Sequence, residues 1–90
     1  MTYQPERNKR RARSKAENEN DVFNFLLTEF RMNLLWDEFQ IDFYEREMAE
    51  PKVVGKAEAE ERRGLYEKNA ANWRRTIEQL EDYGKRKGYV

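Results

Sequence analysis

Residues 22–48, VFNFLLTEFRMNLLWDEFQIDFYEREM, decide how this chain folds. Fifteen of these twenty-seven side chains are large and apolar, which is more than one face of a surface helix can bury. A second helix, expected after Gly55, offers a much narrower apolar stripe. The mismatch predicts that the chain completes its core with another chain, as a dimer or a larger helical bundle.

Two apolar seams run along this first helix at the three-, four- and seven-residue spacings of an α-helix. The first seam, which Asp37 interrupts, consists of Phe23, Leu27, Phe30, Leu34, Ile41, Tyr44 and Met48. The second seam consists of Phe25, Met32, Trp36, Phe39 and Phe43. Core packing is the simpler interpretation of aromatic stripes at this spacing. Because two seams require two packing partners or one that wraps widely, we predict that the second seam forms a chain–chain or partner interface.

Signals for helix ends predict a helix over 15–49, a connection over 50–55 and a second helix over 56–87. Ser14 followed by Glu17 fits a capping box, although a start at residues 20–21 is an alternative. Pro51 blocks continuation of the first helix, and Gly88 is typical of a helix C-terminus. Since a short connection normally reverses the chain, the fold class is an all-α antiparallel two-helix hairpin with a basic N-terminal arm over 1–14.

The second helix carries a single stripe with coiled-coil spacing from Tyr66 onward. Its members are Ala59, Tyr66, Ala70, Trp73, Ile77 and Leu80. Gly64 lies inside this helix, where glycine costs about 1 kcal/mol relative to alanine. It either marks a close approach by aromatic side chains of the first helix or is simply tolerated.

Composition excludes several classes of protein. Ninety residues support one small domain, and the chain contains neither cysteine nor histidine. Disulfides, thiol nucleophiles, imidazole bases and ordinary zinc sites are therefore excluded, and we expect no enzyme, cofactor or metal. No apolar run approaches the roughly 20 residues that span a bilayer, and the N-terminus does not look like a secretory signal. The expected location is cytoplasmic, without a membrane partner.

A basic run near the N-terminus is the alternative functional candidate. Residues 1–16 carry six basic side chains against Glu6, whereas residues 22–48 carry a local charge of −4. Contact with the phosphates of DNA or RNA would come from Arg7, Lys9, Arg10, Arg11, Arg13 and Lys15. A solubilising tail, a targeting signal and an arm that pairs with an acidic protein surface are the competing interpretations.

Two further charge clusters have both a functional and a simpler interpretation. Glu38, Asp42 and Glu45 form an acidic ridge that would dock a basic partner, or that is simply a solvated face. Four arginines of the second helix would form an anion site: Arg62, Arg63, Arg74 and Arg75. The simpler account is that Arg74 pairs with Glu78 and the other three are solvated.

The sequence as a whole favours a small non-enzymatic helical interaction protein that forms homo-oligomers and binds another macromolecule, most simply a protein. An adaptor, an inhibitor or an assembly factor would fit. A nucleic-acid-binding protein that uses the basic arm is the alternative. Short, charge-dense helical chains without cysteine or histidine resemble small accessory proteins of bacteriophages, a likeness of style that no motif carries.

Overall fold

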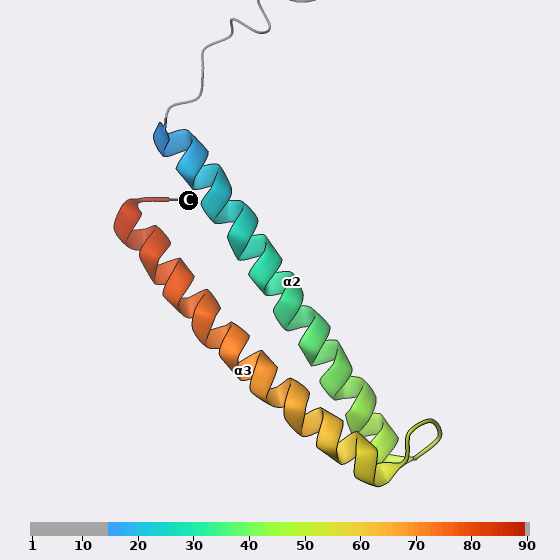
Figure 1. Cartoon of the computed structure of the whole chain (residues 1–90). Coiled ribbons are helices and arrows are strands. Elements are labelled where there is room, and N and C mark those ends of the chain that lie inside the picture. The colour runs from blue at the N-terminus through green and yellow to red at the C-terminus, as the bar shows by residue number, and fades with distance from the viewer. Residues whose placement is uncertain (1–14, 90) are drawn as a thin grey trace, which may run out of the picture.

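The computed structural model describes residues 15–89, which form two α-helices packed against each other. Helix α2 spans Lys15–Ala49 and helix α3 spans Lys56–Lys87, with no strand among the described residues. The helices run antiparallel, joined by a loop at one end (Figure 1). This arrangement confirms the predicted all-α hairpin, and both helices have the expected bounds. The predicted basic arm lies outside the described residues, and assembly with another chain stays a prediction.

The first seam of α2 packs against the stripe of α3. Phe23, Leu27 and Tyr44 are buried on α2, and they face Ala59, Ala70 and Ile77 of α3, which are also buried. Aromatic contacts continue the interface along the hairpin: the ring centroids of Phe30 and Trp73 lie 5.2 Å apart, and the stacked rings of Tyr44 and Tyr66 lie 5.9 Å apart. The first seam is therefore the inner seam of α2, and together with the stripe of α3 it forms the interface between the helices.

The core between the two helices is thin. Among the described residues, no large side chain is completely buried, and the buried apolar residues number only six: Phe23, Leu27, Tyr44, Ala59, Ala70 and Ile77. Two helices enclose only the strip between them, so each leaves its opposite face to solvent. The hairpin is therefore the smallest unit of a helical layer, with one side of α2 and one side of α3 uncovered.

A Schellman motif ends α3 and folds the chain back across the open end of the hairpin. Gly88 adopts a left-handed conformation with φ of 76°, as a helix-terminating glycine does. Its N–H donates to the Lys85 carbonyl at 3.2 Å, and the N–H of Tyr89 donates to the Gly84 carbonyl at 2.8 Å. The turn brings the Tyr89 ring to 5.3 Å from the ring of Phe23. The predicted helix end at Gly88 is confirmed.

Close approach of the helices occurs at Gly84 and not at Gly64. A Cβ atom added at Gly84 would overlap the ring of Phe23, whereas one added at Gly64 would meet nothing within 4 Å. The interpretation of Gly64 as the site of close approach is therefore wrong. The reason is register: Gly84 lies opposite Phe23 at the open end, while Gly64 faces away from α2.

One carboxylate organises the loop between the helices. The Oε2 atom of Glu47 accepts four backbone hydrogen bonds of 2.6–3.1 Å, from the N–H groups of Lys52, Val53, Val54 and Gly55. Burial acts to raise the pKa of Glu47, but the four donors outweigh it and lower the pKa to about 2. Glu47 therefore fixes the loop that leads into α3, whose N-cap residue Gly55 makes no side-chain hydrogen bond.

Candidate interaction surface

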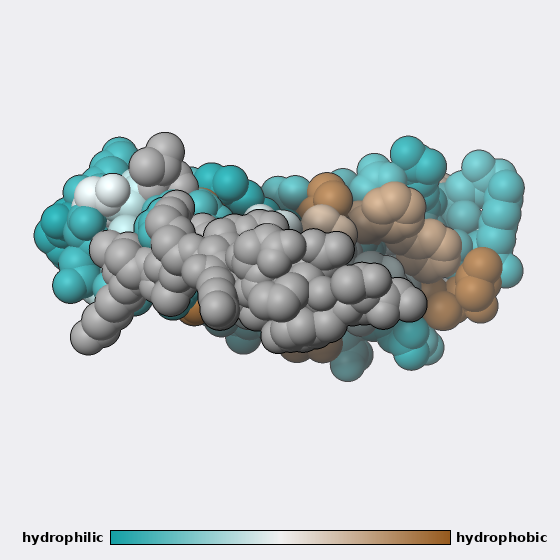
Figure 2. All heavy atoms as spheres, turned by 90° about the horizontal axis from the view of Figure 1, so that it is seen from above, coloured by the Kyte–Doolittle hydropathy of each residue, from teal (hydrophilic) through white to brown (hydrophobic). Residues whose placement is uncertain are grey.

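The second seam lies on the side of α2 that faces away from α3. Its five side chains, Phe25, Met32, Trp36, Phe39 and Phe43, are 41–71% exposed in the single chain. Val22 and Leu35 lie on the same side and are more than half exposed. We call these seven residues together the outer face of α2. Figure 2 shows hydrophobic residues at the molecular surface among polar ones, on the part of the hairpin nearer the loop.

The sequence prediction named five of the seven residues of the outer face and omitted Val22 and Leu35. Val22 could have been found, because it stands three residues before Phe25 and continues the same helical spacing. Leu35 was harder to assign, since it borders the outer face and lies next to Leu34 of the first seam. Its exposed fraction of 55% places it with the outer face.

Ion pairs between the helices involve the predicted acidic ridge. Glu38 of α2 accepts a hydrogen bond from Arg74 of α3 at 3.1 Å. The Oε2 atom of Glu45, also on α2, lies 3.7 Å from Nη1 of Arg63 on α3. Asp42 pairs with Arg46 one turn along α2, at 3.0 Å. Each carboxylate of the ridge therefore already has an arginine partner within the chain. This finding weakens the interpretation of the ridge as a docking surface for a basic partner, since a partner would have to displace these arginines.

The four arginines of α3 do not converge on one anion site. Arg62 pairs with Glu58 and donates to the Tyr44 hydroxyl at 3.1 Å, while Arg75 donates to Asn72 at 3.2 Å. Arg63 lies between Glu45 and Glu67, the latter at 3.4 Å. Arg74 pairs with Glu38 across the helices, so the expected pairing with Glu78 is wrong. These guanidinium groups are directed to partners within the hairpin.

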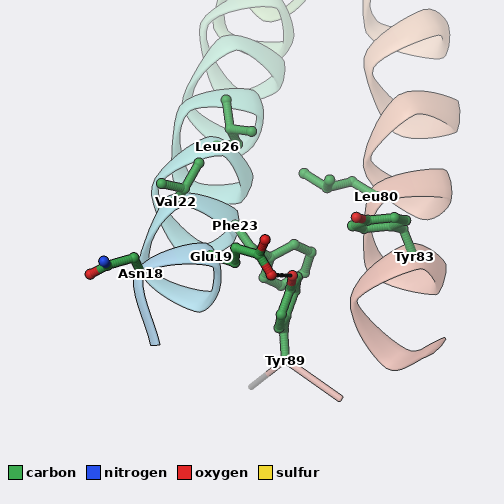
Figure 3. A pocket seen from close by; sticks show the side chains of 8 residues that line it. All are labelled: Asn18, Glu19, Val22, Phe23, Leu26, Leu80, Tyr83 and Tyr89. Carbon is green, nitrogen blue, oxygen red and sulfur yellow. Dashed lines mark hydrogen bonds between the residues drawn. The ribbon is translucent and has the colours of Figure 1, made fainter. Parts of the chain in front are cut away.

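An apolar groove opens between the helices at the end opposite the loop (Figure 3). It has a volume of about 630 Å³ and is lined by Asn18, Glu19, Val22, Phe23, Leu26, Leu80, Tyr83 and Tyr89. The Tyr89 hydroxyl donates to the Glu19 carboxylate at 3.0 Å and closes the floor of the groove. Burial, together with that hydrogen bond, raises the pKa of Tyr89. Val22 belongs to both surfaces, so the groove is continuous with the outer face.

Asp37 is the one polar residue buried within the first seam. It is 6% exposed, and no side chain of the part of the chain described here donates a hydrogen bond to it or forms an ion pair with it. Burial raises the pKa of its carboxyl group. A carboxylate that is buried in an apolar seam costs stability, so Asp37 weakens the packing of the first seam.

The described residues contain no group of three or more carboxylates placed to hold a metal ion. Neither α2 nor α3 is long and apolar enough to cross a membrane. The predicted nucleic-acid-binding residues Arg7, Lys9, Arg10, Arg11 and Arg13 lie outside the described part of the chain, and the side chain of Lys15 does as well.

Fold and surface together define a class: a two-helix hairpin with one apolar face uncovered. Comparisons with protein families, with curated proteins and with solved structures found no match for this chain. The physical properties of the exposed surface are therefore the basis for assigning a function.

Proposed function

We propose that this chain is a small non-enzymatic helical interaction protein that self-associates and binds another macromolecule as an adaptor, an inhibitor or an assembly factor. The observation that supports the proposal is the exposure of the outer face of α2. Four aromatic side chains in one row are unusual on a surface that contacts only water. Aromatic side chains have a large apolar area, so leaving them exposed forgoes a large favourable free energy of burial. The same residue types dominate the energetics of protein interfaces.

The size of the outer face suits an interface better than a free surface. With 41–71% of each side chain exposed, the seven residues present roughly 700 Å² of apolar area, taking about 150–250 Å² for a whole aromatic side chain. The largest apolar patch of a free monomer is about 300–600 Å². One side of a stable protein–protein interface buries about 800 Å². The outer face therefore has about the area that a stable dimer needs.

Light scattering of purified protein tests this proposal. We expect the wild-type chain to have the mass of a dimer or a larger assembly. The double substitution Trp36→Ala with Phe39→Asp removes two aromatic rings and introduces a charge into the outer face, so the mass should fall towards that of a monomer. Circular dichroism should still show much of the helix, because both side chains are mostly exposed in the single chain.

Leu65→Asp is the matched control for that double variant. Leu65 is 56% exposed on α3, away from the outer face, so the same charge placed there should leave the mass unchanged. A wild-type chain that is already monomeric and helical at high concentration would contradict the proposal. An equal loss of mass in Leu65→Asp would show that the effect is not specific to α2.

Nucleic-acid binding through the basic arm is the second candidate, and the run of five basic residues among positions 9–15 favours it. Removal of residues 1–14 should then abolish retention of DNA or RNA. Affinity of the whole chain should fall steeply between about 50 and 200 mM salt, because phosphate contacts release counterions. Unchanged binding after the deletion would remove this candidate and leave the outer face unaffected.

A further inference from the structure

We propose that the outer face of α2 pairs with the same face of a second copy of this chain, with the two α2 helices antiparallel about a two-fold axis near Leu34. The inference rests on the proposed function and adds to it the partner and the orientation. It follows from three properties of α2: the spacing of its exposed residues, the placement of four large side chains symmetrically about Leu34, and the charges in the seam.

The exposed residues of α2 have the spacing of a coiled-coil seam. Steps of three and four residues alternate from one end of the face to the other, as they do between the a and d positions of a heptad. Starting with an a position, the seam reads Val22, Phe25, Glu29, Met32, Trp36, Phe39, Phe43 and Arg46, and all eight are exposed. A helix with this pattern is suited to pack side by side with another helix along its whole length.

The large side chains nearest the proposed axis are symmetric about Leu34: Phe25 and Phe43 lie at equal distances from it, as do Met32 and Trp36, whereas Glu29 stands opposite Phe39 and Val22 opposite Arg46. In an antiparallel pair, each a residue meets a d residue of the other helix. With the axis at Leu34, Phe25 meets Phe43 of the second copy, and Met32 meets Trp36 of the second copy. Two-fold pairing requires one patch to be complementary to itself, and these large side chains satisfy that requirement. Contacts between two aromatic rings, and between a methionine sulfur and an aromatic ring, are favourable in such layers.

Two charged residues within the seam distinguish the antiparallel from the parallel arrangement. A parallel pair in register would place Glu29 against Glu29 and Arg46 against Arg46 of the other copy, and like charges at a seam are repulsive. The antiparallel pair places Arg46 beside Val22 of the second copy, so neither Arg46 nor Glu29 meets a like charge at the seam. Glu29 then meets Phe39 of the second copy within the seam. Charge therefore selects the antiparallel orientation.

Disulfide cross-linking reads out this orientation directly, because the chain has no cysteine of its own. The double variant F25C/F43C should form covalent dimers under mild oxidation. The thiol at position 25 of one copy then faces the thiol at position 43 of the other. A disulfide within one chain is impossible, because the two positions are about 27 Å apart along one helix. Non-reducing electrophoresis should show about tenfold more covalent dimer than in either single variant, F25C or F43C.

Two further variants make the result decisive. E61C/Q79C has the same spacing on the exposed side of α3, and it should give no more covalent dimer than the single variants. L35C places one thiol beside the proposed axis, where it faces its own counterpart, so this single substitution should link efficiently. Leu35 is 55% exposed, so its replacement should not disturb the fold of the hairpin. L35C therefore tests the orientation even if F25C/F43C, which lacks two phenylalanines, does not fold.

Each outcome bears on the inference. Covalent dimers in F25C/F43C or L35C, with little linkage in F25C and F43C alone, support the antiparallel pair. Efficient linkage of F25C with itself and of F43C with itself would overturn it in favour of a parallel pair, and self-association would stand. A dimeric wild-type chain in which neither L35C nor F25C/F43C links would also overturn it. A monomeric wild-type chain would instead overturn the proposed function on which it rests.

Discussion

The two long faces of α2 have similar apolar content and opposite environments. The inner seam contacts α3 and contains Phe23, which is 7% exposed, whereas the outer face contains Phe25, which is 62% exposed. What separates the faces is the helix opposite them. Ala59, Ala70 and Gly84 give α3 one smooth, buried stripe, so it can cover one face of α2 only. The number of apolar residues on α2 thus indicates how much surface has to be buried. The shape of α3 determines which of the two faces is buried within the chain.

Replacement of each phenylalanine by alanine is the strongest way to test this comparison. Phe23→Ala removes a buried ring and should lower the free energy of unfolding by about 3 kcal/mol. Phe25→Ala should change the stability of the monomeric hairpin by no more than about 0.5 kcal/mol, since the ring is exposed there. Urea unfolding followed by circular dichroism at low protein concentration measures both. Equal losses would show that the faces are not distinct.

The glycines of α3 test the inner face next. Gly84→Ala should lower the free energy of unfolding by about 1–3 kcal/mol, because the added methyl group displaces the Phe23 ring. Gly64→Ala is the matched control in the same helix and should raise it by about 0.5–1 kcal/mol, since alanine favours helix and the space is open. Thermal unfolding of both variants measures the difference. A stabilising Gly84→Ala would contradict the packing of Phe23 against α3.

Glu47→Gln should have a smaller, pH-dependent effect, because the amide oxygen keeps part of the acceptor role. The pKa of Glu47 is lowered in the folded chain from 4.5 to about 2, so the ionised carboxylate stabilises the hairpin above pH 4.5. That stabilisation is lost as the pH falls from 4.5 towards 2. Glu47→Gln should therefore unfold several degrees below the wild-type chain at pH 7 and at the same temperature near pH 2. A difference that persists at pH 2 would contradict the role of the charge.

Asp37 should show the opposite pH dependence with the smallest effect. Its pKa is raised in the folded chain, so the protonated form favours folding, and that contribution is lost as the pH rises through the folded pKa. Asp37→Leu should stabilise the hairpin by about 1 kcal/mol at pH 7, since it removes a buried charge from an apolar seam. Urea midpoints at pH 3 and pH 7 measure this, and an Asp37→Leu variant less stable at pH 7 would contradict it.

Features that depend on neighbours in the sequence could be predicted, and features that depend on the register between helices could not. Pro51 and Gly88 mark the ends of α2 and α3, and the spacing of Phe23, Leu27 and Tyr44 identifies the inner seam. The close approach at Gly84 and the pairing of Arg74 with Glu38 arise only after α3 is aligned on α2. A shift of one turn would change both partners while leaving the sequence pattern intact.

The candidate site follows the same division. Helical spacing was enough to group the aromatic residues of the outer face, because all of them lie on one helix. The anchoring of the loop by Glu47 gave no comparable signal, since four backbone N–H groups carry no side-chain identity. The acidic ridge was a visible pattern, but its availability depended on arginines of the other helix. The sequence shows which charged residues are present, but only the fold shows which of them already have an ion-pair partner within the chain.

The chain contains two tryptophans. Trp73 of α3 lies against the inner side of α2, and Trp36 lies on the outer side of α2. Trp73 rests on Phe30 in the hairpin interior, while Trp36 is 63% exposed on the outer face. Intrinsic fluorescence can therefore follow two events with two natural probes. In Trp36→Phe the remaining indole reports unfolding of the hairpin, and in Trp73→Phe it reports whether dilution moves Trp36 from an apolar environment into water.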